Sequence, residues 1–563
     1  MRHLARRSIL LGCVAAGCAM FGCASLHVKQ QATPNWRLLS YSPQAAAEEE
    51  FERAAALEAA GDEASVDAYF AACSLWWQAL SFPPHESPPA AAWDGYNDAV
   101  LGLLRTGQRF SRLDPARGLR IYGGERTFDV PAVHHGFPWQ ASDFQRLHPP
   151  PSRHEKLLTR RYACAGVGAP LVVERCRNVS DAIESRFYPE KSFFAATAVL
   201  RFGAPPQGSR APVAILEFHN PLQVRSVQIA EAELPLAVDL SASLAMTVKE
   251  APRTYLAGFI EPGRAATTAR LGFLEPYQPL KTPVVLIHGL FSDPQSWADL
   301  VNDLRAAPEF AQRHQLWVFR YPTGQGFLQS AAALRRELRA ALAELDPARG
   351  DSALQNAVLI GHSMGGLVAK LQVTYSDEHV WSRLANRPLD QIATTDQTRA
   401  LLAEICYFGP SPDVARVIFM ASPHCGSLPS GACFGQGASL LVEPSPEQAE
   451  LHEQLMRDNP GTFNPLVERR FPTSIDMLTS SSPLLDAMRQ MRLRPGVKLH
   501  NIIGVSHPIS LDGPSDGVVS VASASHPDCL SVLAIPAPHA KVHRSLGASA
   551  EVLRILGCGV FAP

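Results

Sequence analysis

The chain lacks a long internal apolar run, an excess of charge of one sign, and cysteine spacings typical of a metal site. No internal stretch of its 563 residues reaches the roughly 18 uninterrupted apolar residues that a membrane-spanning helix needs. Its 51 Lys and Arg nearly balance 53 Asp and Glu, and the resulting net charge of −2 argues against a nucleic-acid-binding protein. With 46% hydrophobic and 18% charged residues, the composition favours a folded globular protein whose main body is soluble.

The cysteines form no CxxC pair and no Cys/His group with zinc-like spacing, so we expect no structural metal and no cofactor. Three of the 11 cysteines lie in the first 23 residues. In an oxidising compartment two short loops could be closed by disulfides, one joining Cys164 to Cys176 and one joining Cys425 to Cys433.

The N-terminus has the layout of a bacterial secretory signal, with Arg6 and Arg7 ahead of a run of small apolar residues from Ser8 to Gly22. The string Met-Phe-Gly-Cys that ends at Cys23 is similar to the lipobox at which lipoproteins are cut and acylated. Cys18, preceded by Ala-Ala-Gly, is the competing position, and an ordinary signal cleaved near residue 25 is the plainer alternative. We therefore expect an exported protein of the cell envelope, lipid-anchored on the periplasmic or outer-membrane side.

Beyond this segment the predicted secondary structure changes along the chain. Ala-, Glu- and Leu-rich sequence from Ala45 to Ala72 predicts helices, and short apolar runs between Pro and Gly clusters, such as Val213 to Phe218, predict strands. From Pro283 onward strands alternate with helices, which predicts a doubly wound, mostly parallel sheet. The predicted segments are a signal peptide with lipobox at 1–23, a tether at 24–43, a helical cap at 44–115, a β-rich region at 116–275 and an α/β domain at 276–563.

The strongest chemical motif is Gly-His-Ser-Met-Gly at 361–365, a G-x-S-x-G pattern between an apolar strand and a plausible helix. A serine in this position sits on a strained strand-to-helix turn. Gly361 and Gly365 flank it because a Cβ at either position would collide with the neighbouring strand or helix. The context predicts that Ser363 is a nucleophile.

A serine hydroxyl needs a base and an orienting acid to react at neutral pH, and with this turn the chain order is serine, acid, histidine. Downstream of Ser363, each of two predicted strands is followed by a suitable residue. We assign Asp516 as the acid, with Asp512 as its rival, and His539 as the base, with His543 in reserve.

An oxyanion intermediate needs preorganised N–H donors. With this turn one donor is the residue after the nucleophile, Met364, and the other lies in the His-Gly loop after an earlier strand, at Leu290 or alternatively Phe291. His288 and His362 are interpreted as architectural neighbours of the site.

Four stretches together resemble bacterial α/β-hydrolases related to class 2 lipases and to GPI inositol-deacylase-like esterases. They are Ile-His-Gly-Leu at 287–290, Gly-His-Ser-Met-Gly-Gly at 361–366, Val-Ile-Phe-Met-Ala-Ser-Pro-His at 417–424 and Ser-Asp-Gly-Val-Val at 515–519. The resemblance covers about half the chain and implies ester hydrolysis without a metal cofactor. Two departures are Cys425, where relatives usually have Arg, and Pro538, where they usually have Gly.

Two long excursions between the predicted strands, at 375–408 and 428–473, exceed ordinary connections and are expected over the site. Five apolar side chains in them either line an entrance for substrate or form small cores of the excursions themselves: Trp381, Leu384, Leu440, Leu441 and Phe463.

The sequence therefore predicts a serine hydrolase that cleaves carboxylic esters, with an ester or lipid-like small molecule as substrate. An acyltransferase using the same three residues is one alternative. The other is a non-catalytic binding lipoprotein of the envelope. Residues 36–275 carry no recognised motif, and their role stays open.

Overall fold

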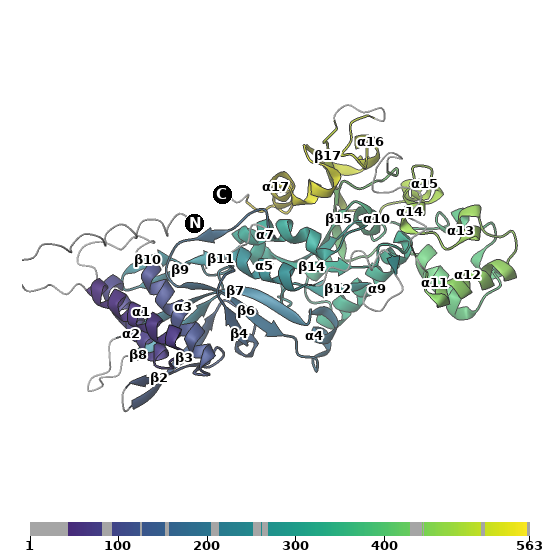
Figure 1. The fold of residues 1–563 in the computed structure, drawn as a ribbon. Helices are drawn as coiled ribbons and strands as arrows, with labels where there is room; N and C mark the ends of the chain where they lie inside the picture. Colours follow the sequence, from purple (N-terminus) through teal and green to yellow (C-terminus); the bar gives the residue numbers. More distant parts are fainter. Residues whose placement is uncertain are drawn as a thin grey trace, which may run out of the picture. The chain divides into compact units, whose positions relative to one another are not determined.

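The computed structural model describes residues 43–81, 93–123, 126–151, 157–203, 213–251, 260–261, 268–427, 442, 444–507 and 513–559. The predicted signal peptide, Cys23 and the tether fall outside these ranges, as do Asp512, Cys433, Leu440 and Leu441. Helices and strands are labelled as in Figure 1.

The C-terminal half is built on a seven-stranded sheet with the order β12-β14-β13-β15-β16-β17-β18, in which β12 is antiparallel to β14 and the other neighbours are parallel. Its strands are β12 (Arg270–Phe273), β13 (Thr282–Ile287), β14 (His314–Arg320), β15 (Ala357–His362), β16 (Val414–Met420), β17 (Lys498–Gly504) and β18 (Cys529–Ile535). The helices of this half are α7 (Ala298–Ala306), α8 (Pro308–Arg313), α9 (Phe327–Leu345), α10 (Met364–Lys370), α11 (Asp396–Cys406), α12 (Pro446–Asp458), α13 (Pro465–Arg469), α14 (Ser474–Met477), α15 (Pro483–Gln490), α16 (Val521–Ala524) and α17 (Leu546–Ile555).

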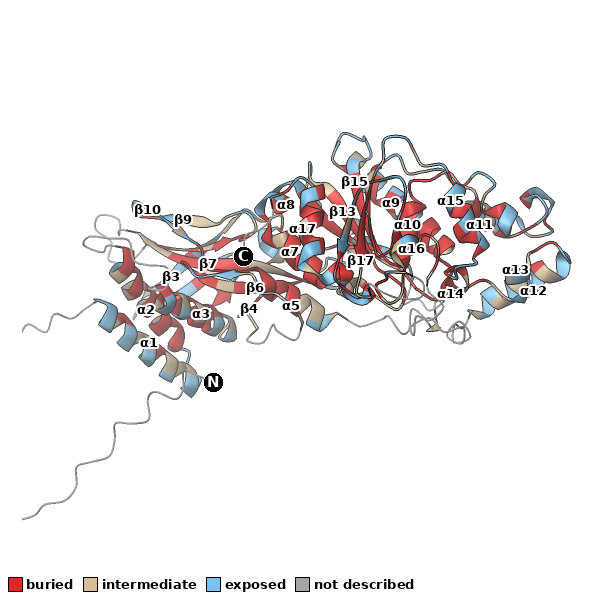
Figure 2. Ribbon diagram, turned by 90° about the horizontal axis from the view of Figure 1, so that it is seen from above, coloured by how far each residue is buried: buried red, intermediate tan, exposed pale blue. Residues whose placement is uncertain are grey.

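Helices cover both faces of this sheet, and its central strands β13 and β15 are almost wholly apolar. β15 is buried at every residue, and so are five of the six residues of β13. Side chains of α9 and α10 pack on one face, and those of α7 and α17 on the other. Figure 2 shows the buried residues concentrated along these strands and on the inward sides of the helices. Strands buried on both faces are expected to read as continuous hydrophobic runs, as these do.

The N-terminal half begins with three helices that pack on a second seven-stranded sheet with the order β1-β2-β3-β8-β7-β6-β4. Only the β3–β8 pair of this sheet is parallel among the described residues. Its elements are α1 (Pro43–Ala60), α2 (Ser65–Ser81), α3 (Asp94–Arg109), β1 (Leu113–Asp114), β2 (Gly118–Gly123), β3 (Arg126–His135), β4 (Arg146–His148), β6 (Ala169–Cys176), β7 (Lys191–Gly203) and β8 (Val213–His219). The rest are two strand pairs, β5 (Ala163–Cys164) with β11 (Val238–Asp239) and β9 (Ser226–Ile229) with β10 (Ala232–Pro235), and the helices α4 (Ala182–Phe187) and α5 (Leu240–Glu250).

Aromatic side chains attach the three helices to this sheet. The Tyr96 hydroxyl donates to the Leu200 carbonyl at 2.7 Å and accepts from the Leu200 amide at 2.8 Å, while Trp77 lies between Trp93 and Phe202. The helices and the sheet therefore share one hydrophobic core.

Two buried aspartates on α7 connect the halves. Asp303 accepts both ends of the Arg160 guanidinium, at 2.6 and 2.7 Å, and the Tyr162 hydroxyl at 2.9 Å. Asp299 accepts the Thr159 amide and hydroxyl, both at 2.8 Å. Because an unpaired buried carboxylate is costly, residues 159–162 of the N-terminal half are part of what stabilises α7.

The structure departs from the sequence expectations in two places. Cys164 and Cys176 are both free, so the disulfide that could have joined them is not formed: β5 pairs with β11, whereas Cys176 ends β6; Cys425, of the second possible pair, is free as well. The region predicted as β-rich also contains α4 and α5. Alternation of apolar residues identifies strands but does not reveal short helices placed between them.

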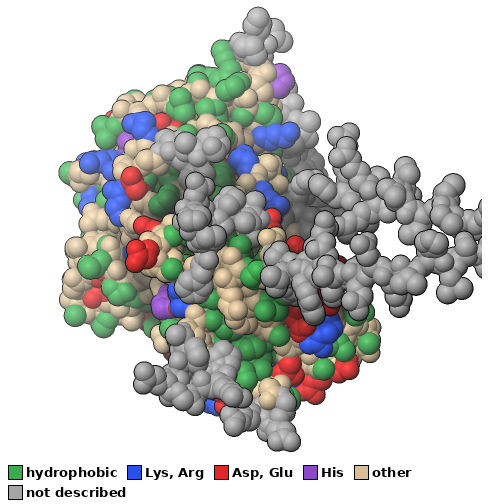
Figure 3. Space-filling view, turned by 90° about the vertical axis from the view of Figure 1, so that its left-hand side faces the viewer, with side chains coloured by type: hydrophobic (Ala, Val, Ile, Leu, Met, Phe, Trp, Pro, Cys, Tyr) green, Lys and Arg blue, Asp and Glu red, His purple; other side chains and the backbone are tan. Residues whose placement is uncertain are grey.

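None of the described helices is both long and apolar enough to span a bilayer. On the face drawn in Figure 3, basic and acidic side chains are interspersed, in keeping with the nearly balanced composition.

Candidate active site

Ser363 sits on a strained turn between β15 and α10, with φ 54° and ψ −125°. Residues other than glycine rarely adopt a positive φ, and holding one in that conformation costs of the order of 1–3 kcal/mol. A Cβ on Gly365 would come within 2.2 Å of the Ile287 carbonyl oxygen, and one on Gly361 within 2.4 Å of the Gly365 oxygen. Both glycines are therefore required by close backbone approach, as predicted, and the turn projects Ser363 from the carboxyl edge of the sheet.

The structure brings Ser363, His539 and Asp516 together from three separate loops. The Ser363 hydroxyl lies 2.9 Å from His539 Nε2, and His539 Nδ1 lies 2.7 Å from Asp516 Oδ2. The other oxygen, Asp516 Oδ1, accepts the backbone amides of Val518 and Val519 at 2.9 and 2.7 Å. Because these amides fix Oδ1, Oδ2 is held toward the imidazole, which then donates from Nδ1 and accepts from the serine at Nε2.

The reserve histidine lies elsewhere. His543 is buried with its ring edge-on to Trp297 at 5.1 Å and 4.1 Å from the ring of His362. Burial lowers the pKa of His543 to about 3. His539, and not His543, is the histidine that the structure places against Ser363.

The proposed oxyanion donors flank the serine. Met364 is the first residue of α10, where helix amides have no partner within the helix. A Cβ on Gly289 would lie 3.0 Å from Ser363 Cβ, so the loop that carries Leu290 is pressed against the serine. Phe291, the alternative donor, has a positive φ of 52°. Leu290 and Met364 each have a backbone N–H, so this edge of the sheet can offer two amide donors to an oxyanion.

His288 and His362 support the loops of the site. His362 Nε2 donates to the His539 carbonyl at 3.0 Å, which attaches the histidine loop to the serine turn. The ring of His288 stacks on Tyr321 at 4.4 Å, and the Tyr321 hydroxyl donates to the His288 carbonyl. Sequence reasoning missed Tyr321, whose contact with His288 depends on two strands separated by a helix pair.

We expect stability to fall as pH drops from 7 to 5, because the histidines behind the site are buried as neutral rings. Desolvation lowers the pKa of His288 to about 4 and that of His543 to about 3. Below about pH 6.5 these histidines bind protons in the unfolded chain but stay neutral in the folded protein. The free energy of unfolding therefore decreases as the pH falls from 6.5 toward the pKa values of the folded state. One such ring accounts for about 2 kcal/mol at pH 5.

The measurement is the free energy of unfolding in urea at pH 7, 6 and 5, for the wild type and His543→Phe. The variant keeps an aromatic ring against Trp297 but cannot bind a proton, so its loss between pH 7 and 5 should be smaller by about 2 kcal/mol. Equal pH dependence in the two proteins would contradict the assignment.

A cavity of about 560 Å³ lies among α9, α11 and the two excursions. Trp381, Leu384 and Phe463 all line it, although Trp381 and Phe463 are also buried in the main core. None of the lining residues is Ser363, His539 or Asp516, but Gly324 and Gln325 in its wall closely follow Tyr321, which contacts the His-Gly loop.

Comparison with known proteins gives one family. Residues 284–521 match the model of the alpha/beta hydrolase family. No curated protein has significant similarity to the sequence. This match and the strand order confirm the predicted fold class, while the narrower likeness to class 2 lipases stays a prediction.

Solved structures match about half of the chain or somewhat less. A lipase of Bacillus licheniformis, BlEst2 in its mature form, is 15% identical, with 52% of this chain and 99% of that chain covered and a TM-score of 0.31. The carboxylesterase CesB of Bacillus subtilis is 11% identical, with 51% and 87% covered and a TM-score of 0.27. Esterase B of Lactobacillus rhamnosis is 14% identical, with 44% and 63% covered and a TM-score of 0.22.

Proposed function

The chain carries an α/β-hydrolase domain, and from that premise we propose that it is a serine hydrolase of carboxylic esters. The observation that carries the proposal is the hydrogen-bonded chain from Ser363 through His539 to Asp516. An adjacent base and an orienting acid are what convert a serine hydroxyl into a nucleophile. The positive φ of Ser363 supports the same assignment, since strained backbone conformations cluster at functional sites.

In the proposed reaction Ser363 Oγ attacks the ester carbonyl carbon while its proton passes to His539 Nε2. The carbonyl oxygen becomes an oxyanion, and the amides of Leu290 and Met364 stabilise it. The tetrahedral intermediate collapses, and the C–O bond to the alcohol breaks as His539 returns its proton to the leaving oxygen. A water then repeats the sequence on the acyl-enzyme, and Asp516 stabilises the imidazolium in both steps.

The test is labelling of the purified protein with a fluorophosphonate, followed by peptide mapping by mass. We expect a single adduct at Ser363 and none in Ser363→Ala. Ser427, a loop serine whose hydroxyl donates to the Leu478 carbonyl, is the internal control and should stay unmodified. Folded protein that forms no adduct at Ser363 would refute the proposed nucleophile.

We propose further that the acyl group is apolar and longer than acetyl. The support is the cavity among α9, α11 and the two excursions, whose volume is within the roughly 300–1,000 Å³ usual for ligand pockets and whose wall is largely apolar. Each buried CH₂ contributes about 0.8 kcal/mol, so kcat/KM for a series of p-nitrophenyl esters should rise at least about tenfold from acetate to octanoate. A series that peaks at acetate would contradict this choice of substrate.

The N-terminal residues support one more proposal, that the protein is exported and acylated at Cys23. Mass analysis of the N-terminal peptide from a bacterial membrane fraction should find a diacylglyceryl group there, lost in Cys23→Ala and kept in Cys18→Ala. The reverse pattern would place the anchor at Cys18, and an unmodified N-terminus near residue 25 would refute acylation.

A further inference from the structure

Three potential metal ligands lie on one face of the N-terminal sheet, remote in sequence from the hydrolase site. β3 and β8 run parallel, and His135 and His219 are directly opposite each other in their register. Glu217 precedes His219 by two residues on β8, and alternate residues of a strand point to the same face. Pairing of these two strands therefore brings two imidazoles and one carboxylate together.

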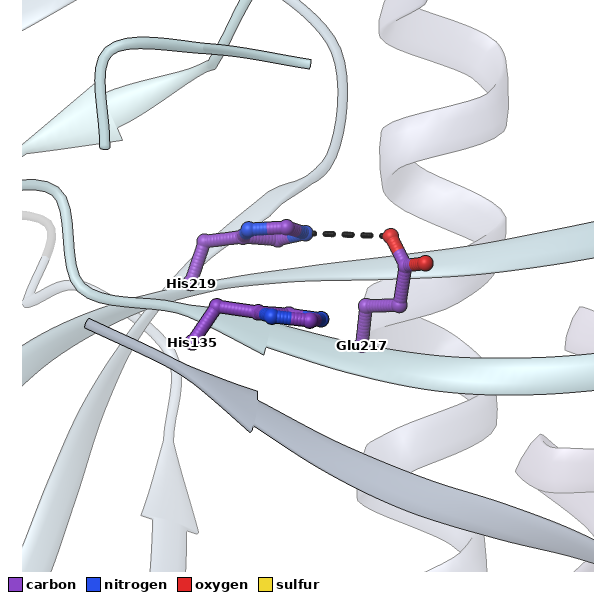
Figure 4. A group of neighbouring side chains, drawn as sticks. All are labelled: His135, Glu217 and His219. Carbon is purple, nitrogen blue, oxygen red and sulfur yellow. Dashed lines mark hydrogen bonds and ion pairs between the residues drawn. The ribbon is translucent and has the colours of Figure 1, made fainter. Parts of the chain in front are cut away.

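The side chains converge, as Figure 4 shows. One potential ligand atom from each residue lies within 4.8 Å of the other two, and His219 Nε2 is 3.1 Å from Glu217 Oε2. The two imidazole rings stack with centroids 4.8 Å apart and an angle of 17° between their planes. Among the described residues this is the one group of three or more such side chains this close together.

From this geometry we propose that His135, Glu217 and His219 bind a divalent transition-metal ion, for which Zn²⁺ is the probe. Two imidazole nitrogens and a carboxylate oxygen form a ligand set that Zn²⁺ accepts, and three protein ligands leave its fourth position for water. Bonds of 2.0–2.2 Å would place ligand atoms roughly 3.3 Å apart, so binding would require the side chains to rotate from their present positions. His135 is half-buried, which leaves the ion a route from solvent.

Besides His219, Glu217 has a second partner, Arg201, which can hold the carboxylate in place for metal binding. Arg201 on β7 donates from Nε to Glu217 Oε1 at 2.9 Å and from Nη2 to Oε2 at 3.1 Å, and its Nη1 donates to the Gln228 carbonyl. A carboxylate offers about four lone-pair positions, so Oε2 can coordinate while Arg201 retains Oε1. Ligating carboxylates are commonly held by such outer hydrogen bonds.

The same sheet contains a matched control. His148 Nε2 lies 2.7 Å from Glu174 Oε2, and Lys191 pairs with Glu174 Oε1 at 2.9 Å. This group also consists of an imidazole, a carboxylate and a basic side chain, but it lacks the second imidazole. If one imidazole and one carboxylate sufficed to bind Zn²⁺, both groups would bind it.

The experiment is calorimetric titration of the chelator-treated full chain with Zn²⁺, for the wild type and for three variants. We expect one equivalent to bind to the wild type and to His148→Ala. His135→Ala and Glu217→Gln should weaken that binding by at least about tenfold, since even the loss of an outer partner costs 10–100-fold. Circular dichroism is used to check that each variant is folded. If His135→Ala is not folded, His135→Asn is used in its place.

A second titration, with Co²⁺, distinguishes these ligands from the cysteines. Visible bands of a four- or five-coordinate ion without intense near-ultraviolet thiolate bands support the proposal. Thiolate bands, binding that His135→Ala and Glu217→Gln leave unchanged, or no stoichiometric binding would overturn it and leave the three residues as a hydrogen-bonded cluster.

Discussion

Replacement of Ser363 by alanine is expected to lower kcat for ester hydrolysis by roughly 10⁵- to 10⁶-fold. The Ser363 hydroxyl is the group that His539 Nε2 contacts, so its removal ends the covalent route and leaves only binding and oxyanion stabilisation. Loss of the nucleophile in the serine protease subtilisin costs about 10⁶ in kcat. The measurement is the rate of p-nitrophenyl ester hydrolysis by the wild type and the variant, in long end-point assays for the variant, each corrected for hydrolysis without enzyme.

Ser427→Ala is the matched control, because it removes a hydroxyl from another loop without touching His539. Its kcat should stay within about twofold of the wild type. A Ser363→Ala variant that keeps more than a tenth of wild-type activity would show that hydrolysis proceeds elsewhere on the protein, and the assignment of Ser363 would be wrong.

The second large effect is expected from Asp516→Asn, about 10⁴-fold in kcat. The amides of Val518 and Val519 require an acceptor at the position of Oδ1, so the asparagine oxygen must take that position. Its NH₂ group then faces His539 Nδ1, which must accept instead of donate. The proton moves to Nε2, which can no longer take the serine proton. The same reversal of the imidazole tautomer costs about 10⁴-fold in serine proteases.

Two variants make this prediction specific. Asp528→Asn alters an exposed aspartate and should be neutral, and Asp512→Asn tests the rival acid of the sequence analysis. Fluorophosphonate labelling of Asp516→Asn should slow by a similar factor while urea denaturation at pH 7 stays cooperative. Large losses in Asp512→Asn combined with near-normal activity in Asp516→Asn would transfer the role of acid to Asp512.

The fold of the C-terminal half could be predicted because its signals are local. Apolar strands buried on both faces, glycines on either side of Ser363 and the order of Ser363, Asp516 and His539 are all visible along the chain. Steric conflict leaves few conformations to a G-x-S-x-G turn, so the pattern and the geometry correspond closely. The choice of His539 over His543 rested on loop position alone, and the structure supplies the contact that separates them.

Features that depend on strand partners could not be predicted. Nothing local indicates that β3 pairs in parallel with β8, so the approach of His135 to Glu217 and His219 is invisible in the sequence. For the same reason the sequence does not show that Cys164 lies on a strand, β5, which pairs with β11 and not with the strand that ends at Cys176. Residue spacing describes neighbours along the chain, whereas these groups are neighbours across a sheet.

The two aspartates on α7 bear on how such a protein can evolve. Asp303 pairs with Arg160 and Asp299 accepts hydrogen bonds from Thr159, two residues that precede the hydrolase domain by more than a hundred positions. A hydrolase domain joined to a different N-terminal half would keep the contacts from Arg544 and Ser549 but would lose the Arg160 guanidinium at Asp303. The N-terminal half therefore completes the charge pairing of α7, and any segment that replaced it would have to supply a cation at Asp303.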